Sequence, residues 1–445
     1  MKYFLPDSQD LVDPSFDFIK ENRSADRVRH QDDHYAHEVF KTRAFDGILI
    51  SKAIVDGTGG AGQAKYTQAQ KRRILREGVR AFFRTEDHPW GPLSFMGDCG
   101  AFTYVKEEKP PYTVDEVIEF YDKCGFDYGI SVDHVILEYR PQWEQDLFSK
   151  DDQGVPAAIR ARQQLTLELA SEFFNTIKRN KLRVIPVGVA QGWGPRSYAH
   201  AARELQKIGF RYIALGGMVP LKTPDILSCL EAVHETRKPD TEIHLLGVTR
   251  LAQLATFAKY GVVSFDSTSP LRQAFKDDKD NYYTLDRTYS AVRVPQVQGN
   301  FRLEARIRSG EVDQDVARAA EQRCLQTLAE YDSGKRAIKS VLEALRTYEL
   351  IHDPRTNRTP IYREVLEASP WKQCPCQVCK QLGHHVILFR GAERNRRRGF
   401  HNVWTFYQRL KRGLADGVTS GAESRPRAKK SVVEEISGNL TLLAG

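Results

Sequence analysis

Short apolar runs alternate with segments of helical periodicity between residues 91 and 267 of the 445-residue chain. The runs cover residues 91–96, 128–132, 183–190, 212–215, 243–247 and 262–265, and an earlier run at 46–55 is a further candidate strand. Strands that alternate with helices form parallel sheets in α/β proteins. So many β-type runs favour a (β/α)8 TIM barrel over an open, doubly wound sheet.

The helices between the runs have recognisable ends. Thr113 and Glu116 form a capping box, and Gly125 follows at the far end of the same helix. The other predicted caps are Ser197, Thr223 and Thr249 at N-termini and Gly261 at a C-terminus. These signals support helices in the intervals between the strands.

Acids, an amide and glycines stand directly after most of the runs. They are Asp98, Asp133, Gln191, Gly192, Gly216, Gly217 and Asp266. In a barrel, the C-terminal ends of all strands converge on one face, where the active site lies. A single aspartate there is explained as a helix cap, but the complete set on one rim indicates a functional site.

The chemistry of this set can be narrowed from its residue types. No strand-end His, Ser or Cys triad accompanies the carboxylates, which excludes the usual acyl-transfer arrangement. No P-loop or G-x-G-x-x-G motif follows a strand. Paired carboxylates suit attack at an anomeric carbon, and strand-end glycines let a flat ligand approach the backbone. The residues indicate glycosyl chemistry with a planar base and do not identify that base.

A cysteine cluster near the C-terminus predicts a metal site. Its candidate ligands are Cys374, Cys376, Cys379 and His401. Three thiolates and one imidazole complete a closed tetrahedral Zn²⁺ site, whose role is structural because no coordination position stays open. His384 and His385 are alternatives for the fourth ligand. We prefer His401 because residues 402–410 have the pattern of a helix that a metal can anchor.

Length and composition indicate a globular protein of more than one domain. Chains beyond roughly 300 residues usually split into domains. No apolar run approaches the length of a membrane span, and the N-terminus lacks the basic-then-apolar order of a secretion signal. The other cysteines show no disulfide spacing. We expect a cytoplasmic protein with no membrane partner.

The formal charge of +8 is small for this length, but the basic residues are concentrated. Between Lys380 and Arg412 the only acid is Glu393. The candidate phosphate contacts in this segment are Arg394, Arg396, Arg397 and Arg398. A second basic stretch, residues 425–430, lies in a tail from residue 417 onward that we expect to be flexible.

The ordered motifs resemble the tRNA-guanine transglycosylase superfamily. The resemblance runs through 97–102, 132–133, 191–192, 216–217, 265–266 and the C-x-C-x2-C…His cluster, and covers roughly residues 90–275 and 370–412. It implies a zinc-bearing TIM barrel that exchanges guanine for a 7-deazaguanine. The N-terminal segments 3–7, 10–14 and 29–37 are more similar to the DpdA branch, whose members insert 7-cyano-7-deazaguanine into DNA.

The resemblance also implies residue roles. Asp266 corresponds to the nucleophile that bonds to C1′ of the sugar. Asp98 corresponds to the general acid/base that assists the departure of guanine and the entry of the new nucleobase. The implied base-recognition residues are Phe102, Asp133, Gln191, Gly192, Gly216 and Gly217. Arg272 corresponds to the first of two arginines that follow the nucleophile and is a further candidate nucleic-acid contact.

Three departures separate the chain from tRNA enzymes. Their Asp-Ser-Gly-Gly is replaced by Asp98-Cys99-Gly100-Ala101, and Phe275 replaces the second arginine, which helps to recognise anticodon-loop bases. A long insertion lies between Asp266 and Cys374, with helix-period segments at about 312–331 and 335–350. The insertion is a candidate clamp for a different nucleic acid.

The sequence therefore predicts a DNA-guanine transglycosylase that inserts 7-cyano-7-deazaguanine through a covalent glycosyl-aspartate. The expected parts are a barrel core at 1–270, a mainly helical insertion at 271–370, a zinc-binding segment with its closing helix at 371–416, and the tail. DNA and the free base are the expected partners, and accessory DNA-modification proteins are candidates. The alternatives are a tRNA-guanine transglycosylase and a non-catalytic nucleic-acid-binding subunit.

Overall fold

The computed structural model describes residues 1–57, 65–144, 154–276 and 279–416. These residues form two compact units. The first contains residues 1–9, 45–268 and 410–416, and the second contains residues 10–44 and 269–409. The predicted flexible tail lies outside the described residues.

The first unit is built on a closed barrel of eight parallel strands in sequence order. The strands are β1 (Lys2–Pro6), β2 (Gly47–Ser51), β3 (Ser94–Asp98), β4 (Tyr128–Ile130), β5 (Ile185–Ala190), β6 (Tyr212–Leu215), β7 (Glu242–Leu245) and β8 (Val262–Asp266). β1 pairs with both β2 and β8, which closes the barrel. The predicted (β/α)8 barrel is confirmed, although β1 was not among the predicted strands.

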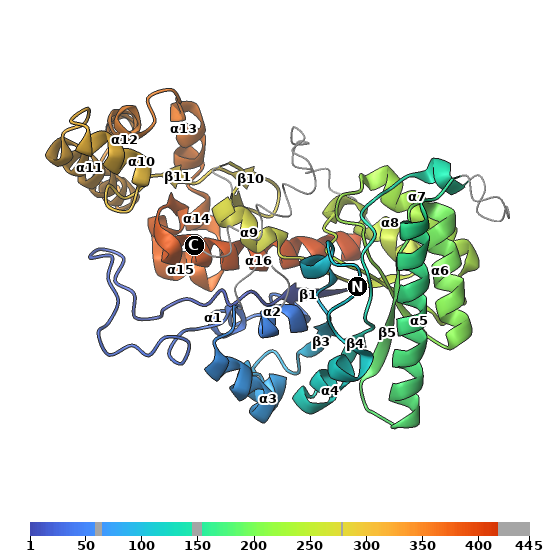
Figure 1. Ribbon diagram of the computed structural model, residues 1–445. Coiled ribbons are helices and arrows are strands. Elements are labelled where there is room, and N and C mark those ends of the chain that lie inside the picture. Colours follow the sequence, from blue (N-terminus) through green and yellow to red (C-terminus); the bar gives the residue numbers. More distant parts are fainter. Residues whose placement is uncertain (58–64, 145–153, 277–278, 417–445) are drawn as a thin grey trace. The chain divides into compact units, whose positions relative to one another are not determined.

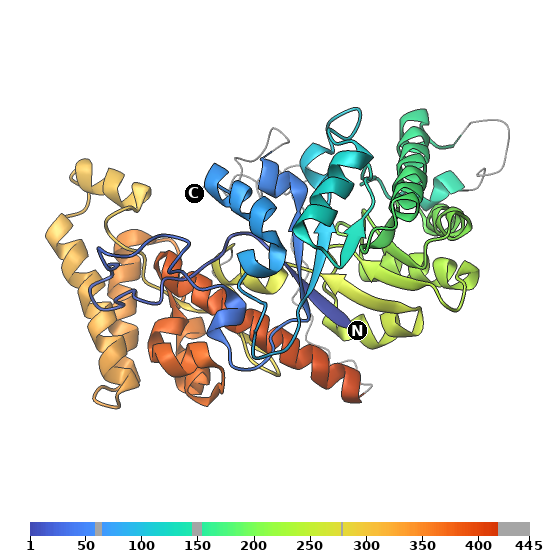
Figure 2. The same cartoon turned by 90° about the horizontal axis from the view of Figure 1, so that it is seen from below.

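Helices separate the strands and lie outside them (Figures 1 and 2). They are α2 (Lys52–Asp56), α3 (Gln68–Phe82), α4 (Val114–Cys124), α5 (Ala157–Arg179), α6 (Pro195–Ile208), α7 (Thr223–Thr236) and α8 (Leu254–Lys259), with short 3-10 turns η1 (Ala101–Tyr104), η2 (Pro141–Glu144) and η3 (Leu251–Gln253). Apolar side chains from the strands, including Phe4, Met96 and Val189, fill the barrel interior.

The helix caps were predicted with mixed success. The capping box of Thr113 and Glu116 and the left-handed Gly125 are both present. Ser197 lies inside α6, where its hydroxyl accepts hydrogen bonds from the backbone N–H groups of the two residues before the helix. Lys222, rather than Thr223, is the N-cap of α7, and the helix predicted after Thr249 begins with the 3-10 turn η3.

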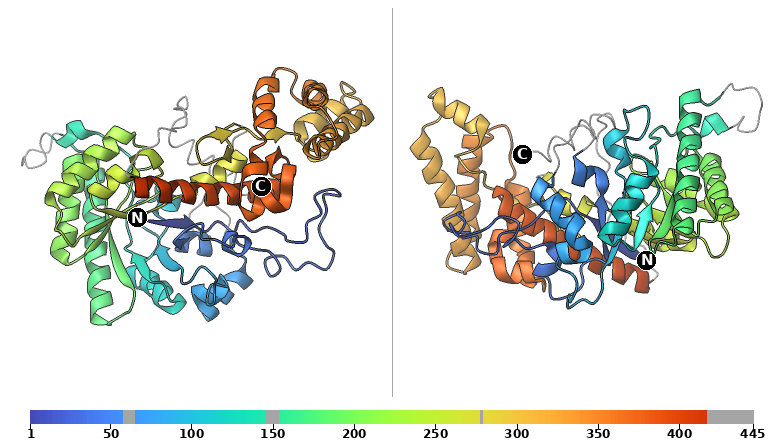
Figure 3. Two further views of the ribbon diagram at one scale, coloured as in Figure 1. Left: turned by 180° about the vertical axis from the view of Figure 1, so that it is seen from behind. Right: turned by 60° about the horizontal axis from the view of Figure 1, so that its bottom comes forward.

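The second unit is mainly helical (Figure 3). Its elements are α1 (Ala36–Val39), α9 (Ser269–Lys276), α10 (Phe301–Arg308), α11 (Gln314–Asp332), α12 (Ile338–His352), α13 (Thr359–Ala368), α14 (Pro370–Gln373), α15 (Gln377–Leu382), η4 (Gly383–Ile387) and the small paired strands β9 (Tyr282–Tyr283), β10 (Thr288–Tyr289), β11 (Val292–Arg293) and β12 (Leu388–Phe389). α11 and α12 lie where helices were predicted. The long helix α16 (Gly391–Asp416) begins in this unit.

None of the described helices is both long and apolar enough to cross a membrane.

Candidate active site and metal centre

Three aspartates gather at the C-terminal mouth of the barrel. Asp98 is the last residue of β3, Asp266 is the last residue of β8, and Asp133 follows β4. Asp133 and Asp266 are buried, while Asp98 keeps part of its surface accessible. The strand-end acids expected to form one site therefore do lie together.

Asp98 is held in a partly protonated state near neutral pH. Burial, the nearby Asp133 carboxylate and the Asp266 carboxylate raise its pKa to about 7, against hydrogen bonds from the backbone of Gly100 and Cys99. A carboxyl group with a pKa near the working pH can both donate and accept a proton during a reaction. Such a raised pKa is typical of a catalytic acid/base.

Asp133 is anchored by two side chains. One carboxylate oxygen accepts from the Cys99 thiol at 3.3 Å, and the other accepts from Gln191 Nε2 at 2.7 Å. Burial raises the pKa of Asp133 to about 6, and these two hydrogen bonds oppose the rise. Burial and both neighbouring aspartates raise the pKa of the Cys99 thiol, so the thiol stays a donor. The Tyr104 hydroxyl donates to Cys99 Sγ at 3.0 Å.

The glycines after β5 and β6 make room for this arrangement. A Cβ on Gly216 would lie 2.2 Å from Gln191 Nε2, so a side chain there would displace the amide that holds Asp133. Gly217 has φ of +70°, a conformation that favours glycine, and a Cβ there would lie 2.3 Å from the carbonyl oxygen of Ile136. Gly192 is packed against Tyr198. Gly216 and Gly217 therefore leave room for the Gln191 amide that holds Asp133.

Phe102 lies in η1, directly after β3, and is half-buried. No ring partner is found for it within the part of the chain that the structure describes. It lies four residues after Asp98 in the sequence.

Asp266 has a neighbour that the sequence did not single out. His244 on β7 is fully buried, and its Nε2 lies 3.2 Å from Asp266 Oδ1. The backbone N–H of Gly247 donates to the same oxygen at 2.9 Å. His244 was missed because it lies inside a run of apolar residues, whereas the predicted site residues all follow the end of a run. The feature of the sequence that could have identified His244 is a single polar residue within a short apolar strand, at a position where side chains alternate between the two faces.

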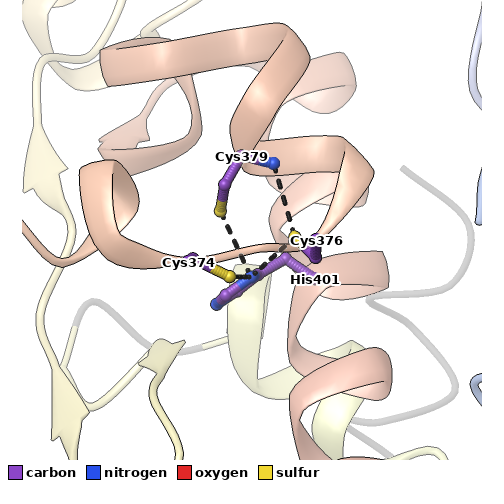
Figure 4. Close-up of side chains that lie close together, drawn as sticks. All are labelled: Cys374, Cys376, Cys379 and His401. Carbon is purple, nitrogen blue, oxygen red and sulfur yellow. Dashed lines mark hydrogen bonds between the residues drawn. The ribbon is translucent and has the colours of Figure 1, made fainter.

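The predicted metal ligands converge in the second unit (Figure 4). Cys374, Cys376, Cys379 and His401 place their ligand atoms within 4.8 Å of one another. The three sulfurs lie 3.3 to 3.6 Å from His401 Nδ1. His401 Nε2 donates to the carbonyl oxygen of Tyr283 at 2.7 Å, which leaves Nδ1 free to bind a metal. The alternative His384 contacts Asp332 instead.

The basic segment is placed differently from the prediction. Arg394, Arg397 and Arg398 are buried and are at most 6% exposed. Arg398 donates to the carbonyl oxygens of Val386, Leu388 and Ala274.

Arg394 and Arg397 donate to the carbonyl oxygens of Phe18 and Asp13, so they hold residues 10–44 against α16 within the second unit. Burial removes these three arginines from the candidate phosphate contacts. Arg396 keeps a 31% exposed side chain, and Arg272 is half-buried.

The buried carboxylates can perform one type of chemistry well. Asp266 has one oxygen fixed by two donors, and Asp98, whose pKa is raised to about 7, lies near it. Asp133 and Gln191 are buried and hydrogen-bonded to each other beside these carboxylates. This arrangement suits displacement at a sugar carbon, in which one base leaves and another enters at the same face.

Comparison with known proteins adds a near full-length relative. The chain is 48% identical over 419 residues, or 93% of its length, to a DNA-guanine transglycosylase from Salmonella montevideo, of which it covers 98%. It is 28% identical over 193 residues to a tRNA-guanine(15) transglycosylase from Pyrococcus furiosus and 27% identical over 197 residues to the Thermococcus kodakarensis enzyme. The latter matches span 41% and 43% of the chain and 28% and 30% of those enzymes. No protein-family model matches the chain.

Proposed function

This chain belongs to the DNA-guanine transglycosylase family, and from that premise we propose that it exchanges guanine in DNA for 7-cyano-7-deazaguanine. The match to the Salmonella montevideo enzyme over 93% of the chain supports DNA as the substrate. The paired carboxylates at the barrel mouth support glycosyl transfer as the chemistry.

The first step releases guanine. The target nucleotide leaves the base stack to enter the barrel mouth, at a cost of a few kcal/mol. A carboxylate oxygen of Asp266 attacks C1′ as the C1′–N9 bond breaks, and the bonding electrons leave with guanine. Asp98, whose pKa of about 7 keeps it partly protonated, donates a proton to the departing base.

The second step inserts the new base. The 7-cyano-7-deazaguanine gives its N9 proton to the Asp98 carboxylate, and N9 then attacks C1′. The bond between C1′ and Asp266 breaks, which restores the Asp266 carboxylate and retains the configuration at C1′. Asp266 attacks from the face opposite guanine and the new base attacks from the face that guanine left, so two inversions retain the configuration and two carboxylates suffice.

The same pocket serves both bases because they share a heterocycle edge. In this proposal Asp133 and Gln191 accept from and donate to that edge, and Phe102 stacks on its face. Gly192, Gly216 and Gly217 keep the floor of the pocket free of side chains. Asp133 is already oriented by Cys99 and Gln191, so little ordering is needed when the base binds.

DNA contacts are proposed for Arg272 and Arg396, the two predicted arginines that keep accessible surface. Helices α10–α13, which lie in the long insertion between Asp266 and Cys374, are a candidate clamp on the DNA backbone. Both assignments concern phosphate contacts, which add affinity without sequence preference.

The Cys374, Cys376, Cys379 and His401 cluster is proposed to hold one Zn²⁺. Tetrahedral zinc with Zn–S near 2.3 Å and Zn–N near 2.0 Å separates sulfur from nitrogen by about 3.5 Å. The sulfur-to-Nδ1 distances of 3.3 to 3.6 Å fit this spacing. Four protein ligands leave no position for substrate, so the zinc would stabilise the second unit.

The test is incorporation of labelled 7-cyano-7-deazaguanine into duplex DNA, single-stranded DNA and tRNA. We expect label in DNA, and no incorporation by Asp266→Ala or Asp98→Ala protein that still binds its metal. Label that appears only in tRNA would overturn the DNA assignment. Full activity of either variant would overturn the catalytic assignment, and failure to trap any covalent DNA adduct would favour a non-catalytic binding subunit.

A further inference from the structure

We propose that His244 is a positioning residue for the nucleophile, fixed by a hydrogen-bonded chain that runs from Tyr212 through Ser264. The chain commits Asp266 Oδ1 to hydrogen bonding and leaves Oδ2 as the attacking oxygen. This inference rests on the proposed function, because it concerns how Asp266 is presented to C1′.

Neighbouring strands bring the chain together inside the barrel. His244 on β7 is directly opposite Ser264 on β8. Tyr212 on β6 is two residues before Ala214, which is opposite His244. Residues two apart on a strand share a face, so all of these side chains point into the barrel interior.

The contacts form one continuous line. The Tyr212 hydroxyl bonds to Ser264 Oγ, which lies 2.6 Å from His244 Nδ1. His244 Nε2 then lies 3.2 Å from Asp266 Oδ1. Ser264 and His244 are fully buried, and the His244 ring meets the rings of Phe4 and Tyr212 edge to face. No solvent molecule can replace these partners without opening the core.

Which group donates in each hydrogen bond follows from Asp266, the residue at one end of the chain. The ionised Asp266 carboxylate only accepts, so His244 Nε2 carries the proton that it donates. In this proposal Nδ1 accepts, and the Ser264 hydroxyl donates to it. Ser264 Oγ in turn accepts from Tyr212, whose pKa burial raises, so that its hydroxyl keeps its proton. The chain therefore selects one tautomer of His244.

The two oxygens of Asp266 differ as a result. Oδ1 accepts from His244 and from the backbone of Gly247, whereas Oδ2 has no hydrogen-bond partner among the described residues. The unbonded oxygen keeps its electron pairs for C1′. Misplacement of a reacting group by about 1 Å can cost about 100-fold in rate, so the orientation that His244 imposes is expected to matter.

The simpler alternative is that His244 only fills the barrel core. It predicts that substitutions act through stability, in proportion to the packing that they lose. Positioning predicts instead that the rate falls while substrate binding and folding are retained. Variants that keep or remove the Nε2 donor separate these alternatives.

The experiment measures kcat, the KM values for DNA and 7-cyano-7-deazaguanine, and the rate of covalent DNA adduct formation in a single turnover. His244→Phe keeps a ring but removes both nitrogens, and we expect kcat and the adduct rate to fall about 100-fold with KM within about threefold. His244→Gln offers an amide donor to Asp266, so its adduct rate should be at least about tenfold higher than that of His244→Phe. Ser264→Ala should give an intermediate loss.

Ser131→Ala is the matched control. Ser131 is a buried barrel serine whose hydroxyl accepts from the Val189 backbone at 3.1 Å and has no contact with Asp266. It should lower thermal stability without lowering the adduct rate. The inference would be overturned if His244→Phe formed the adduct at the wild-type rate. It would also be overturned if the Phe and Gln variants lost the same adduct rate and that loss followed their melting temperatures. Full activity of Asp266→Ala would instead overturn the proposed function.

Discussion

At the scale of single residues, the mouth of the barrel concentrates carboxylates that disfavour one another's ionisation. The pKa of Asp98 rises to about 7 through burial and the charges of Asp133 and Asp266. The folded protein therefore binds a proton on Asp98 that the unfolded chain, with an aspartate pKa near 3.9, releases. The proposed role of Asp98 as acid/base would account for a carboxyl group kept at this unfavourable position.

The first residue-scale prediction is that Asp98→Asn stabilises the protein at pH 8. A raised folded-state pKa makes stability fall as pH rises from about 4 to about 7. Each tenfold change in proton affinity corresponds to about 1.4 kcal/mol, so removal of the charge should increase the free energy of unfolding by about 2 to 4 kcal/mol. Urea denaturation at pH 8 and pH 4.5 checks this, and the gain should nearly vanish at the lower pH.

The second residue-scale prediction concerns the rate of guanine release. Asp98 must be protonated when guanine departs, so the single-turnover adduct rate should be level below pH 7 and fall about tenfold per pH unit above it. Asp98→Asn should be about 100-fold slower or worse and should lose this fall. If the adduct rate of the wild-type protein rose between pH 7 and pH 9, the proposed role of Asp98 as general acid would be contradicted.

Residues at strand ends were predictable, because a barrel brings any strand end to one face. Asp98, Asp133, Gln191 and Asp266 were found on that ground, although their catalytic and binding roles remain proposals. His244 was not found, because the hydrogen bonds that distinguish it join strands that only the fold makes adjacent. The sequence shows only a histidine within an apolar run.

At the scale of elements, the strands from β2 to β8 were predictable because strands buried on both faces are nearly continuous apolar runs. β1 was not, since no helix of the barrel follows it before β2. The error over Arg394, Arg397 and Arg398 has a related cause. Arg394 and Arg397 have their partners Glu21, Phe18 and Asp13 more than 350 residues earlier, beyond the reach of local charge counting. Arg398 donates to backbone carbonyl oxygens, including that of Ala274, which a count of charges does not register.

The element-scale prediction uses two arginines of α16. Arg396→Ala should leave stability within about 0.5 kcal/mol and reduce the slope of log affinity for DNA against log salt by about 1. Arg398→Ala should cost about 3 kcal/mol or more, because buried carbonyl oxygens lose their donor. Fluorescence anisotropy with labelled DNA at several salt concentrations, and urea unfolding, measure the two effects. The reverse pattern would contradict the observed burial.

At the scale of the whole molecule, the metal cluster draws together parts of the second unit. Cys374 and Cys376 lie between α14 and α15, and Cys379 lies in α15. The histidine lies in α16 and donates to the carbonyl oxygen of Tyr283 in β9. A structural zinc contributes to folding directly. The barrel has its own core and closes through its own strands.

The whole-molecule prediction is that Cys376→Ser protein loses its zinc and unfolds in the second unit first. Wild-type protein should hold about one zinc per chain, and the variant close to none. Limited proteolysis should cut the variant within residues 269–409 before the barrel. Cys324→Ser is the control, because Cys324 is a buried thiol in α11 that donates to Ala344 and has no place in the cluster. Equal zinc in both variants would contradict the site.

Residues 10–44 belong to the second unit, although the sequence on both sides of them belongs to the barrel unit. This arrangement constrains the order in which the protein can fold during synthesis. Glu21 pairs with Arg390, which lies 369 residues later. A ribosome that adds about 5 to 20 residues per second reaches Arg390 roughly 20 to 70 seconds after Glu21. During that interval the Glu21 carboxylate lacks Arg390 and Arg394, although Asp13 and Asp33 can already pair with Arg27 of the same segment. The second unit can therefore be completed only once α16 has been made, whereas neighbouring barrel strands can pair as they emerge. A C-terminal truncation before α16 would release the N-terminal loop as well.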